Sequence, residues 1–203
     1  MIDELLAGVG SSAWALPLLF VLVAGDAVLV IVPGETAVTA FAALGAATGS
    51  PPIAGVVAVA AVAAFLGDAL CYALGRTVGL HRWGWMRGRR AQDAFAWARS
   101  RLDRSTAAIV FTARFIPFAR LAVNLTAGAS RIPAPRYLTI AAVAACGWAA
   151  YQSLVGVVVA WLVPGSTLAA VLISIAVALG LGVALDWILA RRVRSDGGPD
   201  AAT

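Results

Sequence analysis

Residues Ala113–Arg120 read ARFIPFAR, and this stretch decides how the surrounding chain can fold. Arg114 and Arg120 are the only charged residues between positions 105 and 130. An arginine at membrane depth costs about 2.5–3.5 kcal/mol on insertion scales, so two of them so close together are costly if they serve packing alone. Pro117 removes a backbone donor and clashes with the preceding turn, which predicts a break in the helix.

A broken helix within a membrane must keep its irregular backbone away from hydrocarbon. Such backbone lines a cavity or lies against protein. The stretch therefore predicts guanidinium groups that point into a polar pocket, where their planar forks suit phosphate or carboxylate. The competing interpretation is that both arginines lie at a membrane edge and extend to water.

The composition indicates an integral membrane protein. Of the 203 residues, 62% are hydrophobic and 12% are charged, with a mean hydropathy of +0.91. Soluble domains are about 45–50% apolar and 25% charged. All fifteen basic residues are arginines, and they interrupt apolar runs or cluster at their ends. This pattern fits membrane topology and anionic lipid head groups better than nucleic acid, for which we expect no binding.

Cysteine and histidine usage argues against disulfide, metal and enzymatic chemistry. Cys71 and Cys146 lie in apolar runs, which predicts two buried thiols and no disulfide. With His81 as the only histidine, we expect neither a metal site nor a cofactor. A membrane phosphatase of the lipid-phosphate type would use histidine as nucleophile or base, and His81 stands in an arginine-rich loop, so we expect no enzyme.

The order of apolar and charged segments predicts an all-α polytopic membrane protein with a single membrane domain. We expect an interfacial lead-in over residues 1–12, the membrane domain over residues 13–190, and a polar, disordered tail over residues 191–203.

Three apolar runs are each long enough to cross about 30 Å of hydrocarbon as helices: residues 53–75, 137–163 and 166–189. The loop over residues 76–104 carries eight arginines and two aspartates. Short loops rich in arginine stay on the cytoplasmic side, and the arginines at the start of the C-terminal tail place that end inside as well.

Charge and length together predict a re-entrant hairpin over residues 105–130, with its break at Pro117. The hairpin follows one cytoplasmic cluster, and the two spans after it cross out and back to another. The first half is similarly interrupted where the apolar run 14–32 ends at Pro33-Gly34. This first segment is either a hairpin from the outer face or a broken spanning helix. Two interrupted segments of opposite approach are typical of a transporter's midplane site.

Three acidic residues lie inside apolar runs: Asp26, Glu35 and Asp68. A carboxylate beside arginine stays ionised, whereas a desolvated one binds a proton, so such a site can couple proton movement to a substrate's charge. Glu35 follows the proline–glycine break at a predicted helix start, where backbone donors are free. Gly67, directly before Asp68, allows close approach of a neighbouring segment.

These residues resemble the motifs of the DedA family, also called the VTT-domain or SNARE-associated Golgi protein family, over about residues 20–165. The first match is an acid at a fixed distance before P-G-E, here Asp26 nine residues before Glu35 of Pro33-Gly34-Glu35. The second is G-D-x-x-x-Y-x-x-G-R, which resembles Gly67-Asp68, Tyr72 and Gly75-Arg76. The third is R-F-x-P-x-x-R followed by A-G, which resembles Arg114-Phe115-Ile116-Pro117, Arg120 and Ala127-Gly128. Two positions depart from the family pattern. The first acid is commonly glutamate, and a proline often stands where this chain has Asn124.

The resemblance implies transmembrane helices plus two proline-broken re-entrant helical hairpins in an inverted arrangement, in the plasma (inner) membrane of a bacterium. It also implies lipid translocation, because bacterial members recycle the polyprenyl (undecaprenyl) phosphate carrier and eukaryotic relatives scramble phospholipids. The expected partner is therefore polyprenyl phosphate or an anionic phospholipid, with a proton or cation as a coupling ion. Whether the protein forms a homo-oligomer stays open.

The family's roles transfer to this chain residue by residue. Arg114 and Arg120 would bind the lipid phosphate, and Asp26, Glu35 and Asp68 would supply counter-charge or couple protons or ions. The residues expected to shape the hairpins are Pro33, Gly34, Pro117, Gly67 and Gly128. Two alternatives remain: a proton-coupled ion or small-solute antiporter that uses the same charges, and a purely structural membrane protein.

Overall fold

The structure is a computed structural model, and it describes residues 8–29, 34–79, 84–104, 106–114, 117–163, 169, 172–173, 176–177 and 180. Every regular element in this part of the chain is a helix, which confirms the all-helical prediction. Most of the expected span over residues 166–189, the tail over residues 191–203 and His81 lie outside the described residues.

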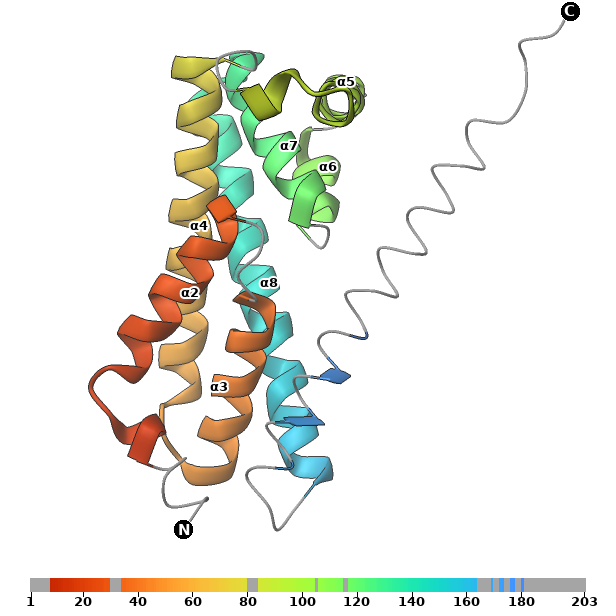
Figure 1. The fold of residues 1–203 in the computed structure, drawn as a ribbon. Coiled ribbons are helices and arrows are strands. Elements are labelled where there is room, and N and C mark those ends of the chain that lie inside the picture. Colours follow the sequence, from red (N-terminus) through yellow and green to blue (C-terminus); the bar gives the residue numbers. More distant parts are fainter. Residues whose placement is uncertain are drawn as a thin grey trace, which may run out of the picture.

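Two long helices, α4 (Ile53–Val78) and α8 (Ala134–Leu162), form the centre of the fold and lie side by side over most of its length (Figure 1). Both are long and apolar enough to cross a membrane, as expected for the runs 53–75 and 137–163. Each begins directly after a proline, Pro52 or Pro133, whose fixed φ suits the start of a helix.

Two pairs of shorter helices flank the long ones. The pairs are α2 (Ala15–Leu29) with α3 (Gly34–Thr48), and α6 (Thr106–Ala113) with α7 (Pro117–Ala129). Each pair precedes one long helix, so the chain repeats the order short, short, long. The first pair covers the lower half of the bundle in Figure 1 and the second pair the upper half, with the interrupted ends near mid-height.

The interruption predicted at Pro117 is confirmed, because α6 ends at Ala113 and α7 begins with this proline. The interruption at Pro33 coincides with the gap between α2 and α3, although Pro33 itself lies outside the described residues.

The two halves are packed crosswise, since α3 lies along α8 and α7 lies along α4. Glycines make both contacts close. A Cβ atom built on Gly156 of α8 would lie 2.3 Å from the Thr39 carbonyl oxygen of α3. A Cβ atom on Gly75 of α4 would lie 2.0 Å from the Leu125 carbonyl oxygen of α7. Small residues allow membrane helices to approach backbone to backbone, and here they join α3 and α7 to the long helix of the other half.

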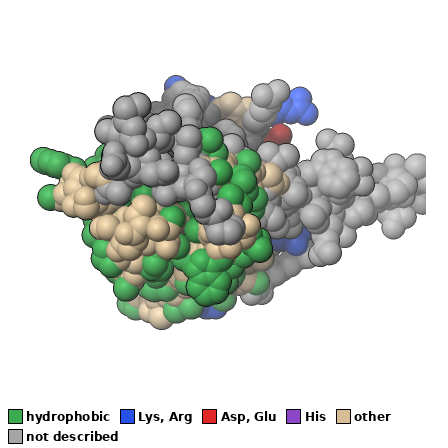
Figure 2. Space-filling view, turned by 90° about the horizontal axis from the view of Figure 1, so that it is seen from below, with side chains coloured by type: hydrophobic (Ala, Val, Ile, Leu, Met, Phe, Trp, Pro, Cys, Tyr) green, Lys and Arg blue, Asp and Glu red, His purple; other side chains and the backbone are tan. Residues whose placement is uncertain are grey.

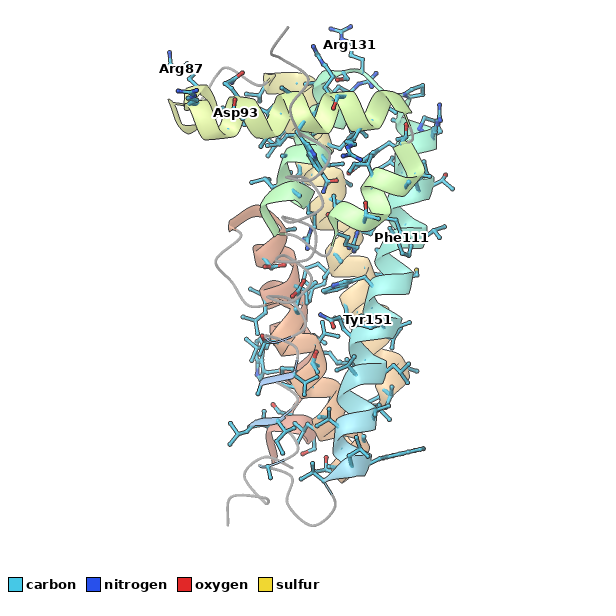
Figure 3. The ribbon with its side chains drawn as sticks, turned by 90° about the vertical axis from the view of Figure 1, so that its right-hand side faces the viewer. Arg87, Asp93, Phe111, Arg131 and Tyr151 are labelled. Atoms are coloured by element: carbon cyan, nitrogen blue, oxygen red, sulfur yellow. The ribbon has the colours of Figure 1, made fainter. Side chains whose placement is uncertain are left out.

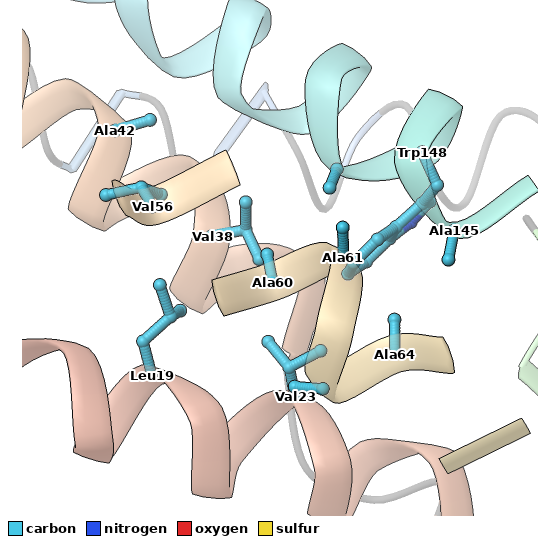
Figure 4. Packing of buried hydrophobic residues seen from close by; sticks show 12 residues of the cluster. Leu19, Val23, Val38, Ala42, Val56, Ala60, Ala61, Ala64, Ala145 and Trp148 are labelled. Atoms are coloured by element: carbon cyan, nitrogen blue, oxygen red, sulfur yellow. The ribbon is translucent and has the colours of Figure 1, made fainter. Parts of the chain in front are cut away.

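An apolar core fills the space between α2, α3, α4 and α8 (Figure 4). It is built largely from alanine and valine around one large ring, that of Trp148. The outward faces of the long helices are also apolar, with Leu66, Leu70, Val143 and Leu154 exposed. Described side chains on the end of the bundle away from α5 are mostly hydrophobic or neutral (Figure 2).

The arginine-rich loop folds into a short 3-10 turn, η1 (Gly84–Arg87), and helix α5 (Arg89–Arg104), which lies across the end of the bundle (Figures 1 and 3). Phe95 is buried with Met86 against Leu125 of α7. Arg99 points to the outside. The sequence favours a helix in the head-group plane; in the structure its apolar face is covered by the second helix pair.

The prediction of two buried thiols is wrong for one of them. Cys71 is buried, but Cys146 is exposed on α8. An apolar run alone does not separate the interior of a bundle from its lipid-facing surface, because both exclude charged groups.

Candidate functional site

The predicted site residues lie on four different helices and next to one interruption. Asp26 is on α2, Glu35 is in the first turn of α3, Asp68 is on α4, Arg120 is on α7, and Arg114 directly follows α6. Four of them, all except Glu35, are joined by ion pairs.

Asp68 is the hub of this cluster. Its carboxylate is almost completely buried and forms an ion pair with each arginine, through Nη1 of Arg114 and through Nε of Arg120 at 3.0 Å. Nδ2 of Asn124 donates a third hydrogen bond to the carboxylate at 2.9 Å. The Tyr137 hydroxyl donates to the Asp68 backbone carbonyl at 3.4 Å. A buried carboxylate needs this number of donors to offset its desolvation.

Arg120 connects the two halves of the molecule. Its Nη1 donates to Oδ2 of Asp26 at 3.2 Å, while its Nε is bound to Asp68. A single guanidinium therefore joins α7 to both α2 and α4. Residues from the two interrupted segments therefore meet at one place.

Arg114 is held between a carboxylate and an aromatic ring. Its Cζ lies 5.4 Å from the centroid of the Trp148 ring, a cation–π contact, while Nη1 is bound to Asp68. The guanidinium is 2% exposed, so neither arginine extends to water as the competing interpretation required. Both arginines are interior residues of the fold.

Several buried N–H groups of this cluster have no acceptor among the described residues. They are Nε and Nη2 of Arg114, Nη2 of Arg120 and Nε1 of Trp148. Nε and Nη2 form one edge of the Arg114 fork, the geometry that binds an oxyanion through two parallel hydrogen bonds. Buried donors are normally satisfied, so unused ones in a charged cluster mark a place for an acceptor.

Glu35 lies beside the ion pairs without joining them. It is partly buried, and no ion pair or side-chain hydrogen bond connects its carboxylate to another described residue. The preceding residue, Gly34, contacts Asp26: a Cβ atom there would lie 2.8 Å from the Asp26 Cβ. The start of α3 is thus packed on the turn of α2 that carries Asp26.

The other two predicted glycines bring helices together near the cluster. A Cβ atom on Gly67 would lie 2.2 Å from the Ala27 methyl group of α2, so close approach is confirmed there. A Cβ atom on Gly128 of α7 would lie 2.0 Å from the Tyr72 carbonyl oxygen of α4. These contacts set the spacing at which Asp68 reaches both arginines.

Three residues of the site were not predicted as such. Asn124 lies one helical turn after Arg120, so both side chains share a face of α7. The sequence feature that could have identified Asn124 as a site residue is that it stands where the family often has proline. Trp148 and Tyr137 offered a weaker signal, since a buried indole N–H or phenol usually needs a partner.

The fold and the site define a class: an all-helical protein in which two interrupted helix pairs meet at buried ion pairs between two apolar helices of membrane-spanning length. The model of the VTT domain matches residues 32–158. The chain belongs to the VTT-domain family, the family of the DedA and SNARE-associated proteins. The match includes Glu35, Asp68 and both arginines, whereas Asp26 precedes it.

No curated protein and no solved structure matches the chain. The family and the two apolar helices together indicate a membrane protein of a transporter-like family.

Proposed function

We propose that this protein is a translocase of phosphate-bearing lipids, with polyprenyl phosphate or a phospholipid as its substrate. The observation that carries the proposal is the set of buried N–H donors on Arg114, Arg120 and Trp148 for which the described part of the chain offers no acceptor. A phosphate group supplies several acceptor oxygens and a negative charge, and it matches the two-donor edge of arginine.

The surroundings of the cluster suit a ligand with a polar head and an apolar tail. The head would bind at the arginines, while the exposed apolar faces of α4 and α8 border the region where a lipid tail stays in the bilayer. We also propose that the protein is a transporter and not an enzyme, with neither metal nor cofactor.

The placement in the membrane is part of the proposal. The α2–α3 and α6–α7 pairs would be re-entrant hairpins entering from opposite sides of a bacterial inner membrane, with the loop over residues 76–104 and the C-terminus in the cytoplasm. Single cysteines in this loop and in the tail should then react with impermeant reagents from the same face. Reaction from opposite faces would exclude a re-entrant α6–α7 pair.

A second candidate function is a proton-coupled ion or small-solute antiporter. The partly buried Glu35 carboxylate supports this alternative, because it lies next to the ion-pair cluster and forms no ion pair with any described residue. In an antiporter the charged cluster would respond to ion gradients without any movement of lipid.

Reconstitution into liposomes tests the proposal. Vesicles carrying the purified protein and a polyprenyl phosphate should expose the phosphate head group on both leaflets faster than empty vesicles. Arg114→Lys keeps the charge but loses the two-donor edge, so it should slow translocation by about tenfold or more. Arg99→Lys, on the exposed face of α5, is the matched control and should translocate like the wild type.

Normal translocation by correctly folded Arg114→Lys and Arg120→Lys would contradict phosphate binding by an arginine fork. Ion flux in the absence of any lipid movement would favour the antiporter.

A further inference from the structure

The charges of the cluster set a condition on phosphate binding. Two arginines are balanced by two carboxylates, those of Asp68 and Asp26. A phosphate that enters this buried cluster adds negative charge that nothing compensates, and burying an unpaired charge is strongly unfavourable. If the proposed function is right, one carboxylate has to leave the arginines when the phosphate arrives.

Asp68 is poorly suited to leave. It accepts from both arginines and from Asn124, its side chain is 2% exposed, and it lies in the middle of a long helix. If Asp68 moved away, the donors of Arg114, Arg120 and Asn124 would all lose their acceptor at once.

The Asp26 carboxylate has fewer hydrogen-bond and ion-pair partners than the Asp68 carboxylate. Its carboxylate makes one ion pair, with Nη1 of Arg120 at 3.2 Å, and accepts a hydrogen bond from the backbone N–H of Gly34. Its side chain is 10% exposed. It belongs to the short helix α2, three residues before the end of that helix. Without Asp26, Arg120 would keep its bond from Nε to Asp68 and would free Nη1 beside the already unused Nη2.

We propose that Asp26 is an exchangeable counter-anion, which occupies Arg120 while the site is empty and is displaced from it by the phosphate of the substrate. The phosphate then binds Nη1 and Nη2 of Arg120 and the Nε–Nη2 edge of Arg114. Asp68, which is itself held by Asn124, keeps the two guanidinium groups in place throughout. This assignment gives Asp26 and Asp68 different roles, and it rests on the proposed function.

The exchange has a mechanical consequence for α2. The turn that carries Asp26 is seated on α4, where the Ala27 methyl group lies over Gly67 and the Ala27 carbonyl accepts a hydrogen bond from the Cys71 thiol at 3.4 Å. Cys71 is 1% exposed in this arrangement. Release of Asp26 from Arg120 removes the ion pair that joins this turn to α7. The turn is then held only by its contacts with α4, so we expect it to loosen and uncover Cys71.

Ligand binding to the full-length protein in detergent tests the exchange, with farnesyl phosphate as the probe, farnesol as the uncharged control and inorganic phosphate as the tail-free control. Asp26→Asn removes the competing anion, so it should bind farnesyl phosphate about tenfold more tightly than the wild type does. Asp26→Glu restores the competitor and should bind like the wild type. Arg114→Gln should lose binding.

The outcomes separate the exchange from the function on which it rests. Equal or weaker binding by Asp26→Asn, with clear binding by the wild type, would overturn the exchange and leave the proposed function standing. No binding of either phosphate probe by the wild type or by Asp26→Asn would overturn both. Binding of inorganic phosphate as tight as that of farnesyl phosphate would keep the exchange and assign the site to free phosphate.

Cysteine labelling gives a second readout in a Cys146→Ala background, which leaves Cys71 as the only thiol. Farnesyl phosphate should speed the reaction of Cys71 with a maleimide severalfold, and Asp26→Asn should react at the faster rate without ligand. Protection of Cys71 by the ligand would overturn the loosening of α2.

Discussion

The contact between α7 and α4 and the contact between α7 and α2 both depend on an aspartate and Arg120, yet they differ in almost every other respect. At the first, Asp68 has three side-chain donors and glycines bring the two backbones together. At the second, Asp26 has one arginine nitrogen and the backbone N–H of Gly34 within its own helix pair, and its side chain is more exposed. The comparison indicates that the Asp68 side of the charged cluster is a fixed support, whereas the Asp26 side is a contact that can be broken.

The largest expected effect is at the fixed side. Asp68→Asn keeps the size of the side chain but leaves two buried arginines without their shared anion, which should cost about 3–5 kcal/mol of stability. Thermal unfolding in detergent should show a large drop in Tm, or little folded protein at all. An unchanged Tm would mean that the α4–α7 contact does not depend on this carboxylate, and the comparison would fail.

A smaller effect is expected from the backbone contact on the same side. Gly128→Ala places a methyl group against the Tyr72 carbonyl oxygen and should cost about 1–3 kcal/mol by forcing α7 away from α4. Gly147→Ala on α8 is the matched control, because its nearest neighbour is the end of the Phe111 ring at 3.3 Å. Equal Tm values for the two variants would show that α7 has room to move.

The smallest effect is expected at the breakable side. Asp26→Asn leaves Arg120 bound to Asp68, so it should lower stability by about 1 kcal/mol, the size of one net hydrogen bond. A double-mutant cycle with Arg120→Gln would measure the coupling directly. A loss as large as that of Asp68→Asn would mean that both contacts are structural, and the exchange proposed above would lose its physical basis.

Local chemistry explains which features could be predicted from the sequence. Pro117 determines the start of α7, and the apolar runs determine α4 and α8, because these depend on the residues themselves. Glycine before Asp68 correctly indicated a close neighbour, since only a residue without a side chain allows one there. The VTT motifs added the family, and its model matches residues 32–158.

The pairing within the cluster could not be predicted in the same way. Which acid reaches Arg120 depends on how α2 crosses α4 and α7, so both Asp26 and Glu35 were candidates from the sequence. The role of Asn124 depends on its distance from Asp68, a residue 56 positions away. Trp148 lies 34 positions after Arg114, and only the packing of α8 brings its ring under the guanidinium.

The crosswise packing of the short helices has a consequence for how the protein is made. When α3 leaves the ribosome, the helix that it packs along, α8, has not been synthesised, and the intervening chain includes the whole second pair. The face of α3 that packs on α8 therefore stays unpacked until the other half is made, and the same holds for the face of α4 that packs on α7. Neither half contains its own complete core, so folding is finished only after both have entered the membrane.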